Sequence, residues 1–200
     1  HLAMDEQRKR ARESWKGSGE EQIAAIYRRL VQEGLKTACT AYDITEHRSQ
    51  VSAIIRNGEI VERAVPGDDI ELVTQSTCFY GESGGQVGDS GIITGNNATI
   101  TVIDTIKPFP ELIIHRGKIT HGSIALGDDI VLSVDNKKRQ ATANNHTATH
   151  ILHATLRSVL GEHVKQAGSL VAPDRCRFDF THYTGLTERE KERIEELVNE

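Results

Sequence analysis

The fold prediction starts from residues 136–160, NKKRQATANNHTATHILHATLRSVL, a stretch that contains neither glycine nor proline. Within it, Ala148, Leu152, Leu156 and Val159 recur at the spacing of one helical face. The stretch therefore predicts a single long amphipathic helix.

The same helix carries three histidines. His146 and His150 are four residues apart, so both rings project from one face and could reach a single cation. His153 returns to within about 20° of His146 on the helical wheel. A bare HxxxH is more often a pair of partly buried histidines than a metal site. The metalloprotease motif HExxH is excluded, because Thr147 stands where that motif has its glutamate base.

Upstream of this helix, residues 37–135 change to a period of two, which is typical of strands. Val51, Ala53 and Ile55 alternate before Asn57-Gly58, which is a hairpin turn signal. Five further breaks separate strand-like runs: Pro66-Gly67-Asp68, Gly95-Asn96-Asn97, Pro108-Phe109-Pro110, Arg116-Gly117-Lys118 and Gly127-Asp128-Asp129. This spacing favours a small antiparallel β-barrel.

The two ends of the chain complete the predicted organisation. A capping box of Ser18 and Glu21 is expected to open a helix before the barrel. After the histidine helix, strand-like pieces at 163–171 and 175–181 precede a charged helix that opens at Thr187 and Glu190. The sequence thus predicts an α+β protein with three parts, a helical lead-in or linker (1–36), a small antiparallel β-barrel (37–135) and an α/β core (136–200).

Composition is that of a chain with a hydrophobic core. Its 200 residues are 37% hydrophobic with a formal net charge of −5, and no apolar run approaches the roughly 18 residues of a membrane-spanning helix. The acidic total does not exclude nucleic acid, because binding depends on local basic clusters. Three cysteines without a CxxC motif disfavour a disulfide scaffold, and the sequence shows no signal segment, so we expect a cytoplasmic protein without a membrane partner.

Two long motifs agree with a known family. Residues 145–153 (NHTATHILH), followed by 161–171 (GEHVKQAGSLV) and 177–180 (RFDF), closely resemble the editing domain of alanyl-tRNA synthetases. Residues 79–89 (FYGESGGQVGD) resemble the glycine-rich motif of the β-barrel that precedes that domain. Threonyl-tRNA synthetases share a related HxxxH core, but the glycine-rich barrel favours the alanyl family. The resemblance covers nearly the whole chain and implies that residues 136–200 form an editing core of the threonyl/alanyl-tRNA synthetase type.

The resemblance also implies a function. Full-length members attach alanine to tRNA(Ala) with ATP and magnesium, in an aminoacylation domain that we expect outside this sequence. Their editing region hydrolyses seryl- and glycyl-tRNA(Ala). A second hydrolytic site is needed because a pocket shaped for alanine cannot strongly reject glycine or serine. The expected partners are the acceptor end of tRNA(Ala) and the rest of the synthetase.

The family site binds zinc through an HxxxH pair and a later CxxxH pair. This places two of the four expected ligands at His146 and His150, which are also the candidate catalytic residues. Cys176 does not begin the second pair, because Phe180 stands four residues on, and we expect that pair after Glu200. With two ligands, we expect zinc to be absent or weakly held and ester hydrolysis to be feeble.

Two substrate-binding residues follow from the same resemblance. Thr149 and Gln166 match positions of the family's pocket, and a hydroxyl and an amide can both form hydrogen bonds with substrate. We expect them to line one cleft with His146 and His150. The alternatives are a structural helical threonine and a solvated strand residue.

Glycines and basic residues supply the remaining candidates. Gly84 and Gly85 are expected to approach the pocket and the tRNA acceptor end, the alternative being ordinary tight turns. They do not form a P-loop, because no GK[ST] follows. Lys137, Lys138 and Arg139 are candidates for tRNA phosphate contact, since cations are poorly placed at a helix N-terminus on electrostatic grounds alone.

Two other functions stay open. One is a non-catalytic module that binds the tRNA acceptor arm, and the other is a free-standing trans-editing protein, against which the helical lead-in argues. The general base also stays open among a histidine, zinc-bound hydroxide and a tRNA hydroxyl.

Overall fold

The computed structural model describes residues 25–200, so the predicted capping box of Ser18 and Glu21 lies outside the described residues. Helix α2 (Ala25–Gln32) comes first. The strands before the next helix are β1 (Ala38–Cys39), β2 (Glu46–Arg56), β3 (Glu59–Val61), β4 (Arg63–Ala64), β5 (Asp69–Thr74), β6 (Ser76–Thr77), β7 (Gly91–Gly95), β8 (Ala98–Phe109), β9 (Leu112–Gly122), β10 (Ile124–Ala125) and β11 (Asp129–Val134). The elements after them are α3 (Asn136–Leu160), β12 (Gln166–Val171), β13 (Cys176–Phe180) and α4 (Glu188–Asn199).

Strands β11, β7, β8, β9, β5 and β2 form an antiparallel barrel in that spatial order, and β11 pairs with β2 to close the ring. Strand β3 adds to β2 through the predicted hairpin, in which Asn57 and Gly58 have φ of 52° and 77°. A two-residue hairpin turn of this type needs positive φ at both positions. The α+β class and the small barrel predicted from the sequence are confirmed.

The barrel interior is filled by aliphatic side chains with one phenylalanine and one cysteine. Its largest fully buried members are Ile54, Leu72, Phe79, Ile93, Ile100, Ile119 and Ile124. Because successive side chains of a strand point to opposite faces, the barrel strands supply the interior with every second residue, except where a β-bulge interrupts the register. No helix within residues 25–200 combines the length and the apolar character that crossing a membrane requires.

The expected alternation of Val51, Ala53 and Ile55 is wrong, because a β-bulge interrupts it. The register between β2 and β5 shifts between Val51 and Ala53. Val51 therefore joins the interior cluster with Ile54. Ala53 and Ile55 instead belong to a second cluster, outside the barrel, that includes Tyr27 of α2. The extra residue of a bulge moves the following side chains to the other face.

One of the five predicted breaks is also wrong. Arg116-Gly117-Lys118 lies inside β9, where Gly117 pairs with Ile70 of β5 and Val102 of β8. A Cβ at this glycine would lie 2.4 Å from the carbonyl oxygen of Thr101. The glycine is required by the close approach of a neighbouring strand and does not form a turn.

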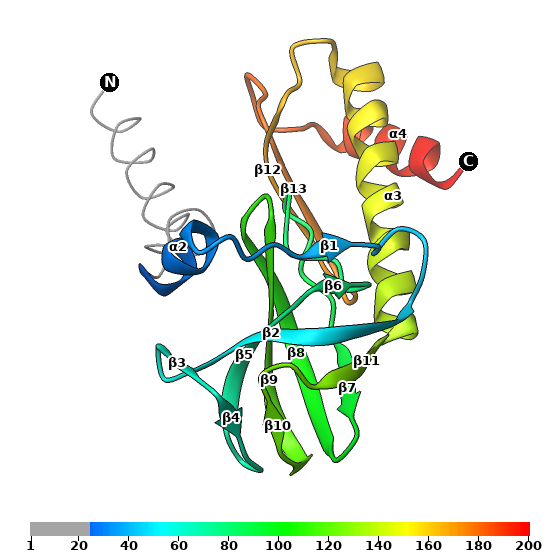
Figure 1. The fold of residues 1–200 in the computed structure, drawn as a ribbon. Coiled ribbons are helices and arrows are strands. Elements are labelled where there is room, and N and C mark those ends of the chain that lie inside the picture. Colours follow the sequence, from blue (N-terminus) through cyan, green and yellow to red (C-terminus); the bar gives the residue numbers. More distant parts are fainter. Residues whose placement is uncertain (1–24) are drawn as a thin grey trace.

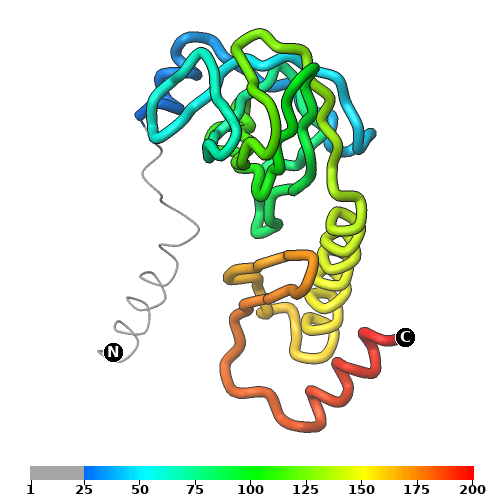
Figure 2. The backbone as a smooth tube through the Cα atoms, turned by 90° about the horizontal axis from the view of Figure 1, so that it is seen from below, coloured from blue at the N-terminus to red at the C-terminus, as the bar shows by residue number. Residues whose placement is uncertain are grey.

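Helix α3 leaves the barrel directly after β11 and runs to a second, smaller body (Figures 1 and 2). That body consists of the β12–β13 hairpin and α4, which enclose an apolar cluster around Leu156, Val164 and Ile194. The predicted capping box of Thr187 and Glu190 opens α4. One continuous helix thus belongs to both bodies, and residues in its first half can meet residues of the barrel.

Candidate functional site

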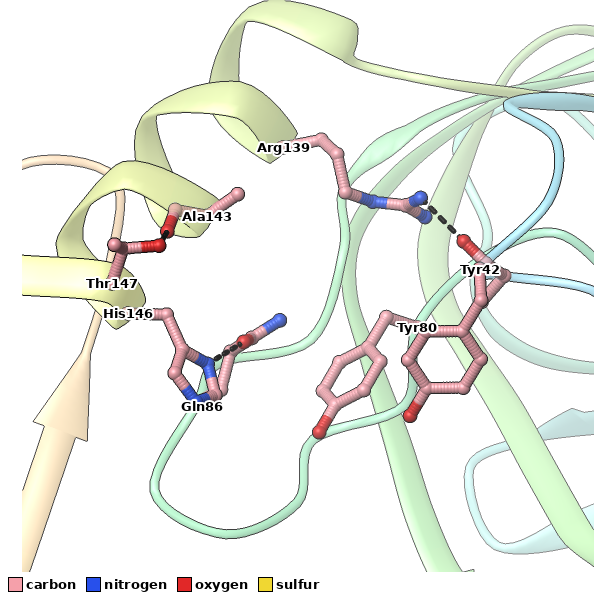
Figure 3. Close-up of a pocket in the computed structure, with 8 residues that line it drawn as sticks. Tyr42, Tyr80, Gln86, Arg139, Ala143, His146 and Thr147 are labelled. Atoms are coloured by element: carbon pink, nitrogen blue, oxygen red, sulfur yellow. Dashed lines mark hydrogen bonds between the residues drawn. The ribbon is translucent and has the colours of Figure 1, made fainter. Parts of the chain in front are cut away.

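A cavity of about 370 Å³ lies where the barrel meets α3. Its walls include Tyr42, Tyr80 and Gln86 from the barrel segments and Arg139, Ala143 and His146 from α3. Figure 3 shows Gln86 and His146 on one side and the two tyrosine rings on the other. The volume falls within the range of about 300–1,000 Å³ that is typical of ligand pockets.

The His146 ring is oriented by Gln86. Its Nδ1 lies 2.6 Å from Gln86 Oε1. An amide oxygen can only accept a hydrogen bond, so Nδ1 carries a proton, and in the neutral ring Nε2 carries the lone pair. The His150 ring stacks on His146, with 4.9 Å between ring centroids and 28° between ring planes. The helix therefore presents a nitrogen that can accept a proton or bind a cation, next to a second imidazole.

A tight turn brings Gln86 to this position. Gly84 and Gly85 have φ of 61° and 85°, and Ser83 and Gln86 exchange backbone hydrogen bonds of 3.2 and 3.0 Å. Val171 of β12 donates its N–H to the Gly85 carbonyl oxygen at 2.7 Å. The positive φ at both positions explains the two glycines, and the backbone contact docks the turn on the hairpin beside α3.

Gln166 joins the same turn through Ser169. Gln166 Nε2 donates to Ser169 Oγ at 3.1 Å, and Ser169 Oγ donates to the Gly84 carbonyl oxygen at 3.3 Å. A Cβ at Gly85 would lie 2.4 Å from Ser169 Oγ and 2.5 Å from its carbonyl oxygen, so the turn could not lie this close to β12 with a side chain there. The glycines and Gln166 are thus connected by direct contacts to the turn that carries Gln86.

Thr149 lies apart from these contacts. It is buried in α3, and its Oγ1 donates to the Asn145 carbonyl oxygen at 2.8 Å, one helical turn back. Neither Thr149 nor Gln166 lines the cavity beside His146. That the two share a cleft with the histidine pair stays a prediction.

His153 does not join the other two histidines. Its ring packs against Phe178 of β13, with 5.0 Å between ring centroids. Its Nε2 is buried and has no hydrogen-bond partner among the described residues. The environment of His153 is therefore the small core under the hairpin.

Arg139 points back toward the barrel. Its Nε donates to the Asp89 carboxylate at 2.9 and 3.0 Å, and Nη2 also contacts that carboxylate. Nη1 and Nη2 donate to the carbonyl oxygens of Ala41 and Cys78 at 2.7 and 2.8 Å. The backbone N–H of Tyr80 donates to the same carboxylate at 2.5 Å. This cluster fastens the first turns of α3 to the barrel.

The two lysines beside Arg139 lie at the start of the helix. The N-cap Asp135 accepts hydrogen bonds from the backbone N–H groups of Lys137 and Lys138, each at 3.1 Å. The Lys138 ammonium donates to Ser90 Oγ at 3.2 Å. The contacts of Arg139 with the barrel explain why a cation lies at the start of α3, and no bound phosphate is needed for that explanation. The tRNA contact of Lys137, Lys138 and Arg139 stays a prediction.

Comparisons with known proteins agree with the motifs. A family model described as tRNA synthetases class II (A) matches residues 1–138. The chain belongs to this family. It is 49% identical over 191 residues to an alanine-tRNA ligase of Anaeromyxobacter dehalogenans, an alignment that covers 96% of this chain and 21% of that protein.

Two further relatives of this family show a similar coverage. An alanine-tRNA ligase of Magnetococcus marinus is 48% identical over 197 residues, covering 98% of this chain and 22% of that ligase. An alanine-tRNA ligase of Desulfosudis oleivorans is 49% identical over 174 residues, covering 87% of this chain and 20% of that ligase. The chain therefore spans about a fifth of the length of the curated relatives it matches and corresponds to part of an alanine-tRNA ligase. The family prediction is confirmed.

The zinc expectation can be compared with the described side chains. Within residues 25–200, no group of three or more histidine, cysteine, aspartate or glutamate side chains is placed to hold a metal ion. The hydrogen bond from His146 to Gln86 is one that a ligating histidine usually makes with its other N–H. That His146 and His150 are zinc ligands stays a prediction. A four-coordinate site would need further ligands from outside the described residues.

Four residues of this site were not predicted from the sequence, among them Tyr80 of the motif 79–89. Gln86 and Asp89 lie in the quoted motif 79–89, where they are polar side chains directly after glycines, and that position is the signal that could have identified them. Tyr42 lies in the segment between β1 and β2, which carried no such signal. Its role becomes visible only when the barrel and α3 are placed side by side.

Proposed function

We propose that the site around His146 is a hydrolytic editing site, which cleaves the ester bond between serine or glycine and tRNA(Ala). The observation that carries this proposal is the 2.6 Å contact between Gln86 Oε1 and His146 Nδ1. It leaves a lone pair on Nε2 of a histidine that lines a cavity of ligand size. Relatives named alanine-tRNA ligase support tRNA(Ala) as the nucleic acid.

The proposed chemistry uses His146 as a general base. Water adds to the ester carbonyl carbon and gives its proton to Nε2. The bond between that carbon and the ribose oxygen then breaks, and the imidazolium returns the proton to the ribose oxygen. Gln86 accepts from Nδ1 throughout, so the ring stays oriented and its positive charge is stabilised. A positioned general base of this kind contributes about 10²–10⁴-fold to a rate.

Zinc and the rest of the protein belong to the same proposal. When bound, zinc would polarise the ester carbonyl as a Lewis acid, and His146 and His150 are the described residues that would hold it. Nε2 of His146 would then bind the metal and could not accept a proton, so the general-base role of His146 belongs to the chain without zinc. We place alanine attachment, with ATP and magnesium, outside residues 1–200. The partners are the tRNA acceptor end and the remainder of the synthetase, and Thr149 and Gln166 are the proposed contacts for the amino acid.

A second function is supported by the same contact. A hydrogen bond between Gln86 and His146 also fastens the glycine-rich turn to α3, as a module that only binds the acceptor arm would need. The two proposals differ in what His146 does. In one it accepts a proton, whereas in the other it is a structural link.

Hydrolysis of charged tRNA separates them. Seryl-, glycyl- and alanyl-tRNA(Ala) are incubated with the chain and with His146→Gln and Gln86→Leu, and the remaining ester is measured over time. We expect slow but measurable loss of seryl- and glycyl-tRNA(Ala). His146→Gln should lower the rate by about 10²–10⁴-fold, and Gln86→Leu by about 10- to 100-fold.

Two comparisons control the assay. His121→Gln changes an exposed histidine of β9 and should leave the rate unchanged. A longer chain that continues through the next CxxxH pair should bind zinc tightly and hydrolyse faster. Equal rates for the wild type and His146→Gln, with tRNA still bound, would favour the binding module over the hydrolase.

A further inference from the structure

Two tyrosines form an aromatic wall of the cavity, opposite the histidine. Tyr42 is 84% exposed, and its ring meets that of Tyr80 edge to face, with 6.1 Å between centroids and 78° between planes. Tyr80 is fixed at its backbone and at its hydroxyl. Its backbone N–H donates to the Asp89 carboxylate, and its hydroxyl donates to the Ser83 carbonyl oxygen at 3.3 Å. Tyr42 has no hydrogen-bond partner among the described residues. The fixed Tyr80 ring thus packs against the Tyr42 ring, which is open to solvent.

On the α3 side, the cavity is lined by the small side chains of Ala143 and Thr147. The Thr147 hydroxyl donates to the Ala143 carbonyl oxygen at 3.1 Å. The hydrogen-bonded pair of Gln86 and His146 lies across the cavity from the tyrosine rings (Figure 3). Since Gln86 uses its oxygen for His146, its Nε2 is left as a donor without a partner among the described residues. Small side chains on one side and rings on the other leave a slot suited to a flat group.

The charges of the cavity favour a neutral group over a phosphate. Arg139 is the cation among the lining residues, and the Asp89 carboxylate neutralises it through a side-chain contact that is largely buried. What remains is an aromatic face, an amide donor and hydroxyls. This combination recognises unpaired bases in RNA, which stack on aromatic side chains and hydrogen-bond through their edges.

We propose that this cavity receives the terminal nucleobase of the RNA, stacked on Tyr42, so that the adjoining ribose faces His146. The proposal rests on the proposed function for the identity of the RNA and for the ester that the ribose carries. It adds a subsite for the base that is distinct from the contacts to the amino acid. Tyr42 and Tyr80 then act as positioning residues, because they hold the nucleotide and do not touch the ester.

Binding of uncharged RNA tests the subsite without hydrolysis. The probe is a hairpin with the acceptor-stem sequence and a single-stranded CCA end, compared with the same hairpin whose last nucleotide lacks its base. Wild-type affinity should fall by roughly 5- to 100-fold when the base is removed. In Tyr42→Ala the two hairpins should bind equally. Tyr183→Ala, which removes another largely exposed tyrosine, should keep the wild-type difference.

The outcomes separate this subsite from the proposed hydrolysis. A difference between the hairpins that Tyr42→Ala abolishes supports the subsite even if the chain cleaves no ester. An equal loss in the wild type and Tyr42→Ala, or no loss in the wild type, overturns it even if ester hydrolysis is found. Absence of RNA binding at the highest protein concentration used also overturns it. Tyr42→Phe should behave as the wild type, since stacking needs the ring and not the hydroxyl.

Discussion

Replacing Arg139 by methionine should destabilise the chain strongly. The change leaves the Asp89 carboxylate, whose side chain is 7% exposed, without its cation. Removing one partner of a buried ion pair costs roughly 3–5 kcal/mol. The Arg139 side chain is 20% exposed, which places that loss near the lower end of the range. The two lost hydrogen bonds to backbone carbonyl oxygens add about 1 kcal/mol each. We therefore expect a total loss of about 5 kcal/mol.

Urea unfolding followed by far-ultraviolet circular dichroism measures this loss. With a slope of about 2 kcal/mol per M, the midpoint should fall by roughly 2.5 M. Arg193→Met is the matched control, because Arg193 pairs with Glu196 on α4 and both side chains are more than half exposed. That variant should lose less than about 1 kcal/mol.

The comparison also bears on the predicted tRNA contact of Arg139. Equal midpoints for Arg139→Met and Arg193→Met would refute the structural role derived above. A phosphate contact would then be the better explanation of a cation at the start of α3. If Arg139→Met is strongly destabilised, the ion pair with Asp89 accounts for the residue by itself.

Three further predictions concern His115, Gly88 and Cys78. Burial lowers the pKa of His115 to about 4 from 6.5, so the folded state binds fewer protons, and about 2 kcal/mol of stability should be lost between pH 7 and pH 5. His115→Gln should remove this part of the pH dependence of urea unfolding. Gly88→Ala should abolish stable folding, since its Cβ would lie 1.9 Å from the Thr105 carbonyl oxygen, whereas Gly185→Ala, with open space around it, should unfold at the wild-type midpoint. Burial raises the pKa of the Cys78 thiol to about 11, so a thiol reagent at neutral pH should modify the two exposed cysteines of the native chain, and rapid reaction of the third would contradict the structure.

The elements that sequence reasoning located correctly are those governed by local rules. The bounds of α3 follow from a stretch without glycine or proline, and they are the bounds that the structure gives. The capping box at Thr187 and the hairpin turn at Asn57-Gly58 are short patterns with a direct stereochemical cause. Each depends on residues within a few positions of one another.

The features that sequence reasoning missed depend on contacts between distant residues. Arg139 and Asp89 are 50 residues apart, and His146 and Gln86 are 60 apart. The bulge in β2 and the close approach at Gly117 are set by the neighbouring strands. Periodicity describes one segment at a time, so it cannot show which face a bulge inverts or which side chain from elsewhere reaches a histidine.

The geometry of the histidine site therefore depends on the barrel as much as on the helix that carries the rings. Two backbone hydrogen bonds, from Val134 N to Thr45 O at 2.9 Å and from Asp135 N to Ser90 O at 2.8 Å, fix where α3 leaves the barrel. The glycine-rich turn that follows β6 in the chain is in addition hydrogen-bonded to β12. Gln86 is thus held between the two bodies, and its oxygen fixes the proton of His146 on Nδ1. Residues 136–200 alone would keep both histidines but lose the hydrogen bond that fixes the His146 proton on Nδ1.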